Sequence, residues 1–98
     1  MQQQLAGPAE RRVFAALSYA AHGDRDALCY LYCRFAEDVF ASILPMTNDA
    51  PAAEELTRSL FADLPQAIAD YDPRLDGPFP DWLLEVARES TVDRRRPA

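Results

Sequence analysis

The most reactive side chains in this sequence are two cysteines and a single histidine. Cys29 and Cys33 stand four residues apart in an apolar stretch, which puts both thiols on one face of a helix. Their spacing is not that of a CxxC redox motif, and with only His22 to join them they complete no common zinc pattern. We therefore expect two free thiols, buried or half-buried in the core, and no metal site.

Catalysis has no better support than metal binding. None of the four serines stands in a nucleophile motif, and His22, beside a Gly-Asp turn, is a poor candidate for a general base. The three glycines lie too far apart to form a phosphate-binding loop. We predict that the protein is not an enzyme and uses no cofactor, so a small enzyme is the least favoured function.

Charge is unevenly distributed along the chain. The sequence carries 16 acidic residues against ten arginines, a net charge of −6 that argues against coating nucleic acid by bulk attraction. Residues 1–81 have a net charge of −7 and residues 82–98 a net charge of +1. Any contact with a polyanion is therefore expected near the carboxyl end.

The spacing of apolar residues predicts the fold class. A chain of 98 residues has room for one domain, and its apolar residues recur with the helical period, without the alternation of strands. We predict an all-α fold, a compact bundle of about four helices over residues 9–96, after a disordered tail at residues 1–8. No apolar run approaches the roughly 20 residues that span a membrane, and no signal-peptide pattern is present. We expect a cytoplasmic protein.

The first two predicted helices cover residues 8–22 and a longer segment that begins after Asp24. Gly23 ends the first helix, and Asp24 is the expected N-cap of the second. Pro45 is expected to close the second helix, with residues 46–50 as a loop. Spacings of three and four predict a wide core-facing stripe on the second helix: Leu28, Leu31, Tyr32, Phe35, Val39 and Ile43.

The third and fourth predicted helices cover about residues 51–70 and 81–95. Pro65 lies inside the third, where it removes a hydrogen bond and clashes with the preceding turn, so we predict a kink or a break near Leu64. Residues 72–80 contain three prolines and a glycine and predict an irregular, stiff loop. Four residues of the last helix are expected to face inward: Trp82, Leu83, Val86 and Ser90.

Taken in order, several short stretches give the chain a family likeness. They are GDRDAL at 23–28, AEEL at 53–56, AIADYDP at 67–73, WL at 82–83, VAR at 86–88 and VDR at 92–94. This series resembles region 2 of bacterial RNA polymerase sigma factors, and most closely the extracytoplasmic-function class. The resemblance covers nearly the whole chain in the right order.

The resemblance implies two binding surfaces. The third helix would dock on the clamp helices of the polymerase beta-prime subunit, on the face opposite Leu56, Leu60 and Leu64. The loop and the last helix would hold the melted non-template strand of the minus-ten promoter element. The implied polymerase-binding residues are Glu55, Arg58, Ser59 and Asp63. The implied strand-binding residues are Asp76, Gly77, Phe79, Trp82, Arg88, Glu89, Asp93, Arg94 and Arg95. An anti-sigma protein is a further candidate partner.

Some residues depart from the family pattern. Arg58 and Ser59 stand where a glutamine followed by an acid is usual, and Glu89 stands where a base-reading asparagine is often found. Carboxylates at Asp81, Glu85 and Glu89 repel phosphates and only accept hydrogen bonds. These departures favour an alternative: a divergent sigma-like regulatory module that binds a protein partner and no DNA.

Some of the implied strand-binding residues also have a purely structural interpretation. Phe79 and Trp82 would then close the bundle as core residues, and the arginines at 94–96 would be a solvated chain end. A continuous basic patch over the loop and last helix would favour promoter contact. An acidic or apolar patch there would favour a protein partner.

Overall fold

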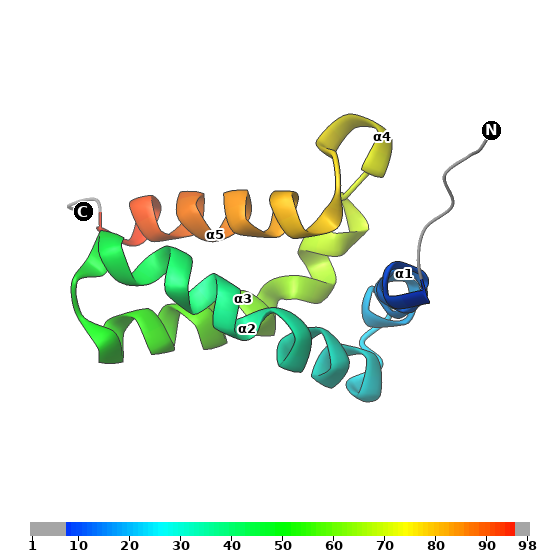
Figure 1. Ribbon diagram of the computed structural model, residues 1–98, viewed down its shortest axis with the longest axis horizontal. Helices are drawn as coiled ribbons and strands as arrows, with labels where there is room; N and C mark the ends of the chain where they lie inside the picture. The colour runs from blue at the N-terminus through cyan, green and yellow to red at the C-terminus, as the bar shows by residue number, and fades with distance from the viewer. Residues whose placement is uncertain (1–7, 96–98) are drawn as a thin grey trace.

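The computed structural model describes residues 8–95, and within them all regular secondary structure is helical, with no strand (Figure 1). The predicted all-α bundle is confirmed. Its helices are α1 (Pro8–Ala20), α2 (Arg25–Thr47), α3 (Ala50–Ala69), α4 (Pro73–Asp76) and α5 (Phe79–Arg95). The tail predicted at residues 1–8 lies, except for Pro8, outside the described residues.

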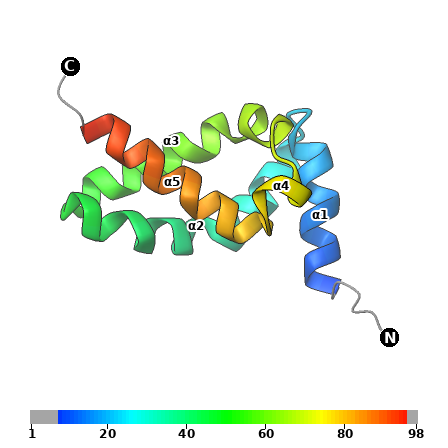
Figure 2. The same cartoon turned by 90° about the horizontal axis from the view of Figure 1, so that it is seen from above.

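Three long helices form the body of the molecule. Helices α2 and α3 run antiparallel as a pair, and α5 lies over both of them (Figures 1 and 2). Helix α1 crosses one end of the pair and contacts both α2 and α3. Each of the other long helices therefore packs against α2, which is the centre of the bundle.

The two ends of α2 are fixed by side-chain and backbone caps. The Asp24 carboxylate accepts a hydrogen bond from the Ala27 N–H at 2.9 Å, which confirms the predicted N-cap. Gly23 precedes it with φ +84°, a left-handed conformation that favours glycine. At the other end Asn48 is left-handed, with φ +56°, and its N–H bonds the Leu44 carbonyl at 2.7 Å.

The two interior prolines do not break their helices, so the predicted end of the second helix at Pro45 is corrected. Helix α2 continues through Pro45 to Thr47, and only two residues separate it from α3. Pro45 lies in the last turn, where its missing donor costs one hydrogen bond and the Asn48 cap still closes the helix. Of the kink or break predicted near Leu64, no break occurs, because α3 runs on through Pro65 to Ala69. The last turns of α3 nevertheless take a new direction (Figure 1).

The core follows the predicted stripe of α2 in its central part. Leu31, Phe35, Val39 and Ile43 are buried, whereas Leu28 is half-buried and Tyr32 is exposed. From the other helices, the buried side chains that face this stripe include Leu17, Leu60, Phe61, Leu64, Ile68, Leu83 and Ala87. Packing on three sides of one helix excludes water from most of its length.

Two hydroxyls inside this core are satisfied within their own helices. Thr57 Oγ1 donates to the Ala53 carbonyl and Thr91 Oγ1 donates to the Ala87 carbonyl, each at 2.8 Å. Both threonines are buried, so these bonds remove the cost of an unpaired polar group. This arrangement explains how two polar residues can be buried in an apolar core.

The stretch predicted as an irregular loop contains one ordered helical turn. The Asp72 carboxylate caps it by accepting from the Arg74 N–H at 2.9 Å, and the Asp72 N–H donates to Asp76 Oδ2 at 2.9 Å. Gly77, at φ +83°, then reverses the chain. Helix α5 begins at Phe79, two residues earlier than expected, because a proline such as Pro80 is tolerated in a first turn.

Tyr71 ties this turn to the bundle. Its hydroxyl donates to the Gly77 carbonyl at 2.6 Å, and its ring lies 5.7 Å from Phe79 and 4.8 Å from Trp82, between centroids. Burial, then the nearby charges of Asp76 and Asp72, raise the pKa of Tyr71 above its usual value. The protonated hydroxyl is therefore the form that the folded state favours.

We expect Leu31→Ala to lower the free energy of unfolding by about 2 to 5 kcal/mol, because it leaves a cavity in a fully buried site. Urea unfolding followed by circular dichroism measures this change. The matched control is Glu37→Ala on the exposed face of α2, with an expected change within about 0.5 kcal/mol. Equal effects of the two substitutions would contradict the central role of α2.

We expect Tyr71→Phe to cost about 0.5 to 1.5 kcal/mol at neutral pH, because the Gly77 carbonyl loses its donor. The folded pKa of Tyr71 lies above the ordinary value of 10.0, so its stabilising contribution is complete below pH 10 and is lost as pH rises through the folded pKa.

The measurement is urea unfolding as a function of pH. The free energy of unfolding should fall more steeply above pH 10 in the unchanged chain than in Tyr71→Phe. Tyr19→Phe is the control, since that ring is 63% exposed and should leave the pH profile as it is. Identical profiles for all three proteins would refute the proposed role of the Tyr71 hydroxyl.

Candidate functional site

The four implied polymerase-binding residues lie on α3, but not on one face. Glu55, Arg58 and Asp63 are exposed, and Ser59 is half-buried. At 100° per residue, Ser59 and Asp63 fall beside Leu56 rather than opposite it. The predicted placement on the face opposite the leucines is therefore wrong for these two residues. Asp63 faces the groove between α3 and α5, and Glu55 and Arg58 face α2. Ser59 borders both grooves.

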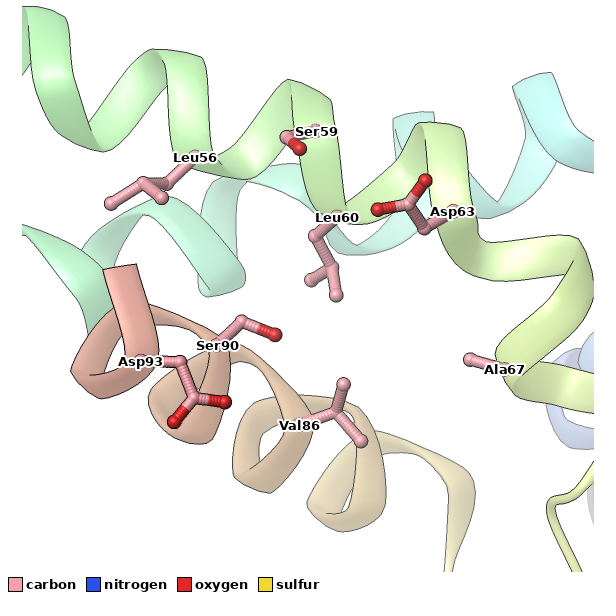
Figure 3. Close-up of a pocket in the computed structure, with 8 residues that line it drawn as sticks. All are labelled: Leu56, Ser59, Leu60, Asp63, Ala67, Val86, Ser90 and Asp93. Carbon is pink, nitrogen blue, oxygen red and sulfur yellow. The ribbon is translucent and has the colours of Figure 1, made fainter. Parts of the chain in front are cut away.

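The groove between α3 and α5 encloses about 380 Å³. Leu60 and Val86 point toward one another across it, and the lining also includes Asp63 from α3 and Asp93 from α5 (Figure 3). The sequence did not predict that Asp93 would line the same groove as the docking residues Ser59 and Asp63. No signal in either helix alone indicates that placement, because it depends on how α5 packs on α3.

A second groove lies between α2 and α3 and has a volume of about 620 Å³. Its lining is mainly apolar, and the rings of Tyr32 and Phe61 meet edge to face at 5.1 Å between centroids. Glu55 and Arg58 also line it. The exposed surface of α3 is therefore bordered by two grooves, one on each side.

The two cysteines line the α2–α3 groove and correct a prediction. Cys29 and Cys33 are free thiols, as expected, but both are exposed rather than buried. Each stands two residues from Leu31, a rotation of about 200° that takes it off the buried stripe. Of the described residues, no group of three or more His, Cys, Asp or Glu side chains is placed to hold a metal ion.

The aromatic residues implied in strand binding have different exposures. Phe79 is only 5% exposed and packs edge to face on Phe35 at 5.4 Å, so its ring is part of the core. Trp82 is half-buried and lies 5.6 Å from Phe79. The structural interpretation is confirmed for Phe79, whereas Trp82 keeps part of its ring accessible.

The polar residues implied in strand binding do not form a basic patch. Asp76 and Glu89 are exposed, and Gly77 is a half-buried part of the turn. Arg88 is exposed and pairs with Glu85 at 3.1 Å. The side chains of Arg94 and Arg95, and the whole of Arg96, lie outside the described part of the chain.

The surface made by α4 and α5 is acidic in the described residues. Between residues 72 and 93 there are six acidic residues and two arginines, a net charge of −4. The second arginine, Arg74, pairs with Asp72 at 3.7 Å, so both of these cations already face a carboxylate. Exposed pairs of this kind add little stability, but they reduce the positive charge offered to a phosphate.

No helix within residues 8–95 is long and apolar enough to cross a membrane. No protein-family model and no solved structure matches this chain significantly.

One curated relative does match. The protein "ECF RNA polymerase sigma factor SigK" of Mycobacterium ulcerans (strain Agy99) is 32% identical over 82 residues, which cover 84% of this chain and 43% of that protein. The chain thus spans less than half the length of this relative. Sigma factors are not enzymes, which agrees with the prediction that this chain has no catalytic role. The predicted resemblance is confirmed, and the chain belongs to the extracytoplasmic-function family of RNA polymerase sigma factors.

Proposed function

We propose that this chain acts in the cytoplasm as a sigma-factor region 2 domain in transcription initiation. It binds the RNA polymerase core through the clamp helices of the beta-prime subunit. It also binds the melted strand of the minus-ten promoter element. The observation that carries this proposal is the 32% identity to SigK over 82 residues. That match covers most of the helical bundle. Because it spans 43% of the relative, the proposal concerns only the partners of the matched region.

Helix α3 is the proposed docking element. Its exposed residues Glu55, Arg58 and Asp63 stand between two grooves whose floors are mainly apolar. A helical partner can place apolar side chains in such a groove and charged ones along its edges. Arg58 then requires an acidic partner residue, and Asp63 a basic one.

Trp82 is the proposed contact for an unstacked base. Part of its ring is accessible, and stacking of a base on an aromatic side chain is worth about 1 to 3 kcal/mol. The net charge of −4 over residues 72–93 opposes the approach of phosphates. We therefore place strand binding within the assembly with polymerase, where other basic surfaces can hold the backbone.

A second candidate function follows from the same acidic surface. A sigma-like regulatory module would bind a protein partner through α4 and α5 and would not contact DNA. The six acidic residues between 72 and 93 favour this candidate, because they suit a partner with a basic surface. An anti-sigma protein is one such partner.

We expect Asp63→Arg to weaken binding to a fragment carrying the beta-prime clamp helices by about tenfold, since a like charge would meet the basic partner residue. Fluorescence anisotropy with the labelled fragment measures the affinity. Glu37→Arg on α2 is the matched charge reversal and should bind as the unchanged chain does. Absence of binding by the unchanged chain at about 50 µM would remove the docking proposal.

We expect Trp82→Ala to weaken binding of a labelled single-stranded minus-ten oligonucleotide by about fivefold or more, measured with polymerase core present. Val92→Ala is the control, because Val92 is an apolar side chain of α5 that is 48% exposed. Glu89→Gln should strengthen binding, because it removes a charge that repels phosphate. Core binding without any strand binding would instead support the regulatory module.

A further inference from the structure

The largest described cavity lies between α1, α2 and the segment around α4, and its lining includes Phe79, one of the implied strand-binding residues. It has a volume of about 810 Å³, within the range of about 300 to 1,000 Å³ that is usual for small-molecule sites. Helices α1 and α4 lie at the same end of the molecule, yet none of their Cα atoms approach within 8 Å of one another (Figures 1 and 2). The space between them is therefore held open by the bundle.

We propose that this cavity binds a small amphipathic anion, with one carboxylate head and an apolar or aromatic body. Among the described side chains, its lining includes two arginines, Arg11 from α1 and Arg34 from α2, and no acidic residue. The whole chain has a net charge of −6, so this is a local reversal of the general charge. This site does not rest on the proposed sigma-factor function, although the two sites share Phe79.

Arg34 is the proposed partner of the carboxylate. Its guanidinium carbon lies 5.3 Å from the centroid of the Phe35 ring, a distance suited to a cation–π contact. Within residues 8–95, Arg34 forms no ion pair. Phe35 is buried, so the guanidinium rests on a fixed support and its donors remain available. A planar guanidinium can donate two parallel hydrogen bonds to one carboxylate.

The remaining lining suits an apolar body. Phe14 is 62% exposed at the cavity, so a ligand that covers this ring would remove apolar surface from water. Pro73, Pro78 and Pro80 line the side formed by the α4 segment, and their fixed φ angles make that side stiff. A rigid cavity loses little conformational entropy when a ligand enters it.

The acidic groups near the cavity argue against a polyanion. Asp72 and Asp76 act on Tyr71, which lines the cavity, but they are not themselves part of its lining. A single carboxylate bound to Arg34 need not approach Asp72 or Asp76. The phosphates of a nucleic acid would instead contact the acidic surface of α4 and α5. A compact anion with one charge is therefore the favoured ligand class.

The test uses 8-anilinonaphthalene-1-sulfonate as a fluorescent amphipathic anion, titrated into the purified full chain. We expect saturable binding that 2-naphthoate and decanoate displace. The uncharged methyl ester of 2-naphthoate should compete about tenfold more weakly than the acid, because it lacks the charge. Weaker displacement by decanoate than by 2-naphthoate would indicate an aromatic body, and the reverse order an aliphatic one.

Two substitutions separate the cavity from other apolar surfaces. Arg34→Gln should weaken 2-naphthoate binding about tenfold, and the matched control Arg58→Gln, in the α2–α3 groove, should leave it unchanged. Phe14→Ala changes an exposed side chain, so it tests the apolar contact in a protein that keeps its core. Circular dichroism and urea unfolding confirm that each variant is folded.

Several outcomes would overturn the proposal. They are equal competition by the acid and its ester, equal loss in Arg34→Gln and Arg58→Gln, and no effect of Phe14→Ala. An increase in dye fluorescence that occurs only when the chain unfolds would also overturn the proposal, because partly folded chains bind this dye without a specific site. Binding of an acidic peptide in place of both small acids would make the cavity a protein-docking site instead.

Discussion

The packing of three helices on the single stripe of α2 is the constraint on which the rest of the structure depends. Leu31, Phe35, Val39 and Ile43 recur every four residues and are buried from three sides. A stripe this wide leaves α1, α3 and α5 little freedom in where they lie, because each must exclude water from part of it. Both grooves of α3 and the cavity beside α1 are the spaces left between these packed helices.

A cluster of aromatic side chains connects the buried stripe of α2 to the proposed strand-binding segment. Phe79 packs on Phe35 of α2, and Tyr71 contacts both Phe79 and Trp82. The ring of Phe79 therefore holds the start of α5 in the core, whereas Tyr71 and Trp82 are half-buried. Of the aromatic residues implied in strand binding, Trp82 is the one that remains partly exposed, and it stands on an acidic surface.

Much of the fold could be predicted from local patterns, because caps and helical periodicity act over a few residues. Asp24, Gly23 and the central part of the α2 stripe behave as their spacing indicates. Pro45 does not end its helix as predicted, since its cost is a few hydrogen bonds and steric contacts, which packing along a whole helix outweighs.

The candidate site could be predicted less well than the fold. The exposed α3 residues were found by family position, but their division between two grooves depends on neighbouring helices. Cys33 shows the same difficulty, because an apolar stretch of sequence does not say which side of a helix is buried. The presence of Asp63 and Asp93 in the lining of one groove depends on the tertiary arrangement of α3 and α5.

The short link between α2 and α3 also bears on how the chain reaches this structure. Only Asn48 and Asp49 join the two helices, and the left-handed Asn48 already directs the chain back on itself. Closing so small a loop costs little chain entropy, so the two helices can pair before the distant segments arrive. Folding that starts from neighbours in sequence has low contact order, which is the topology of rapid folders.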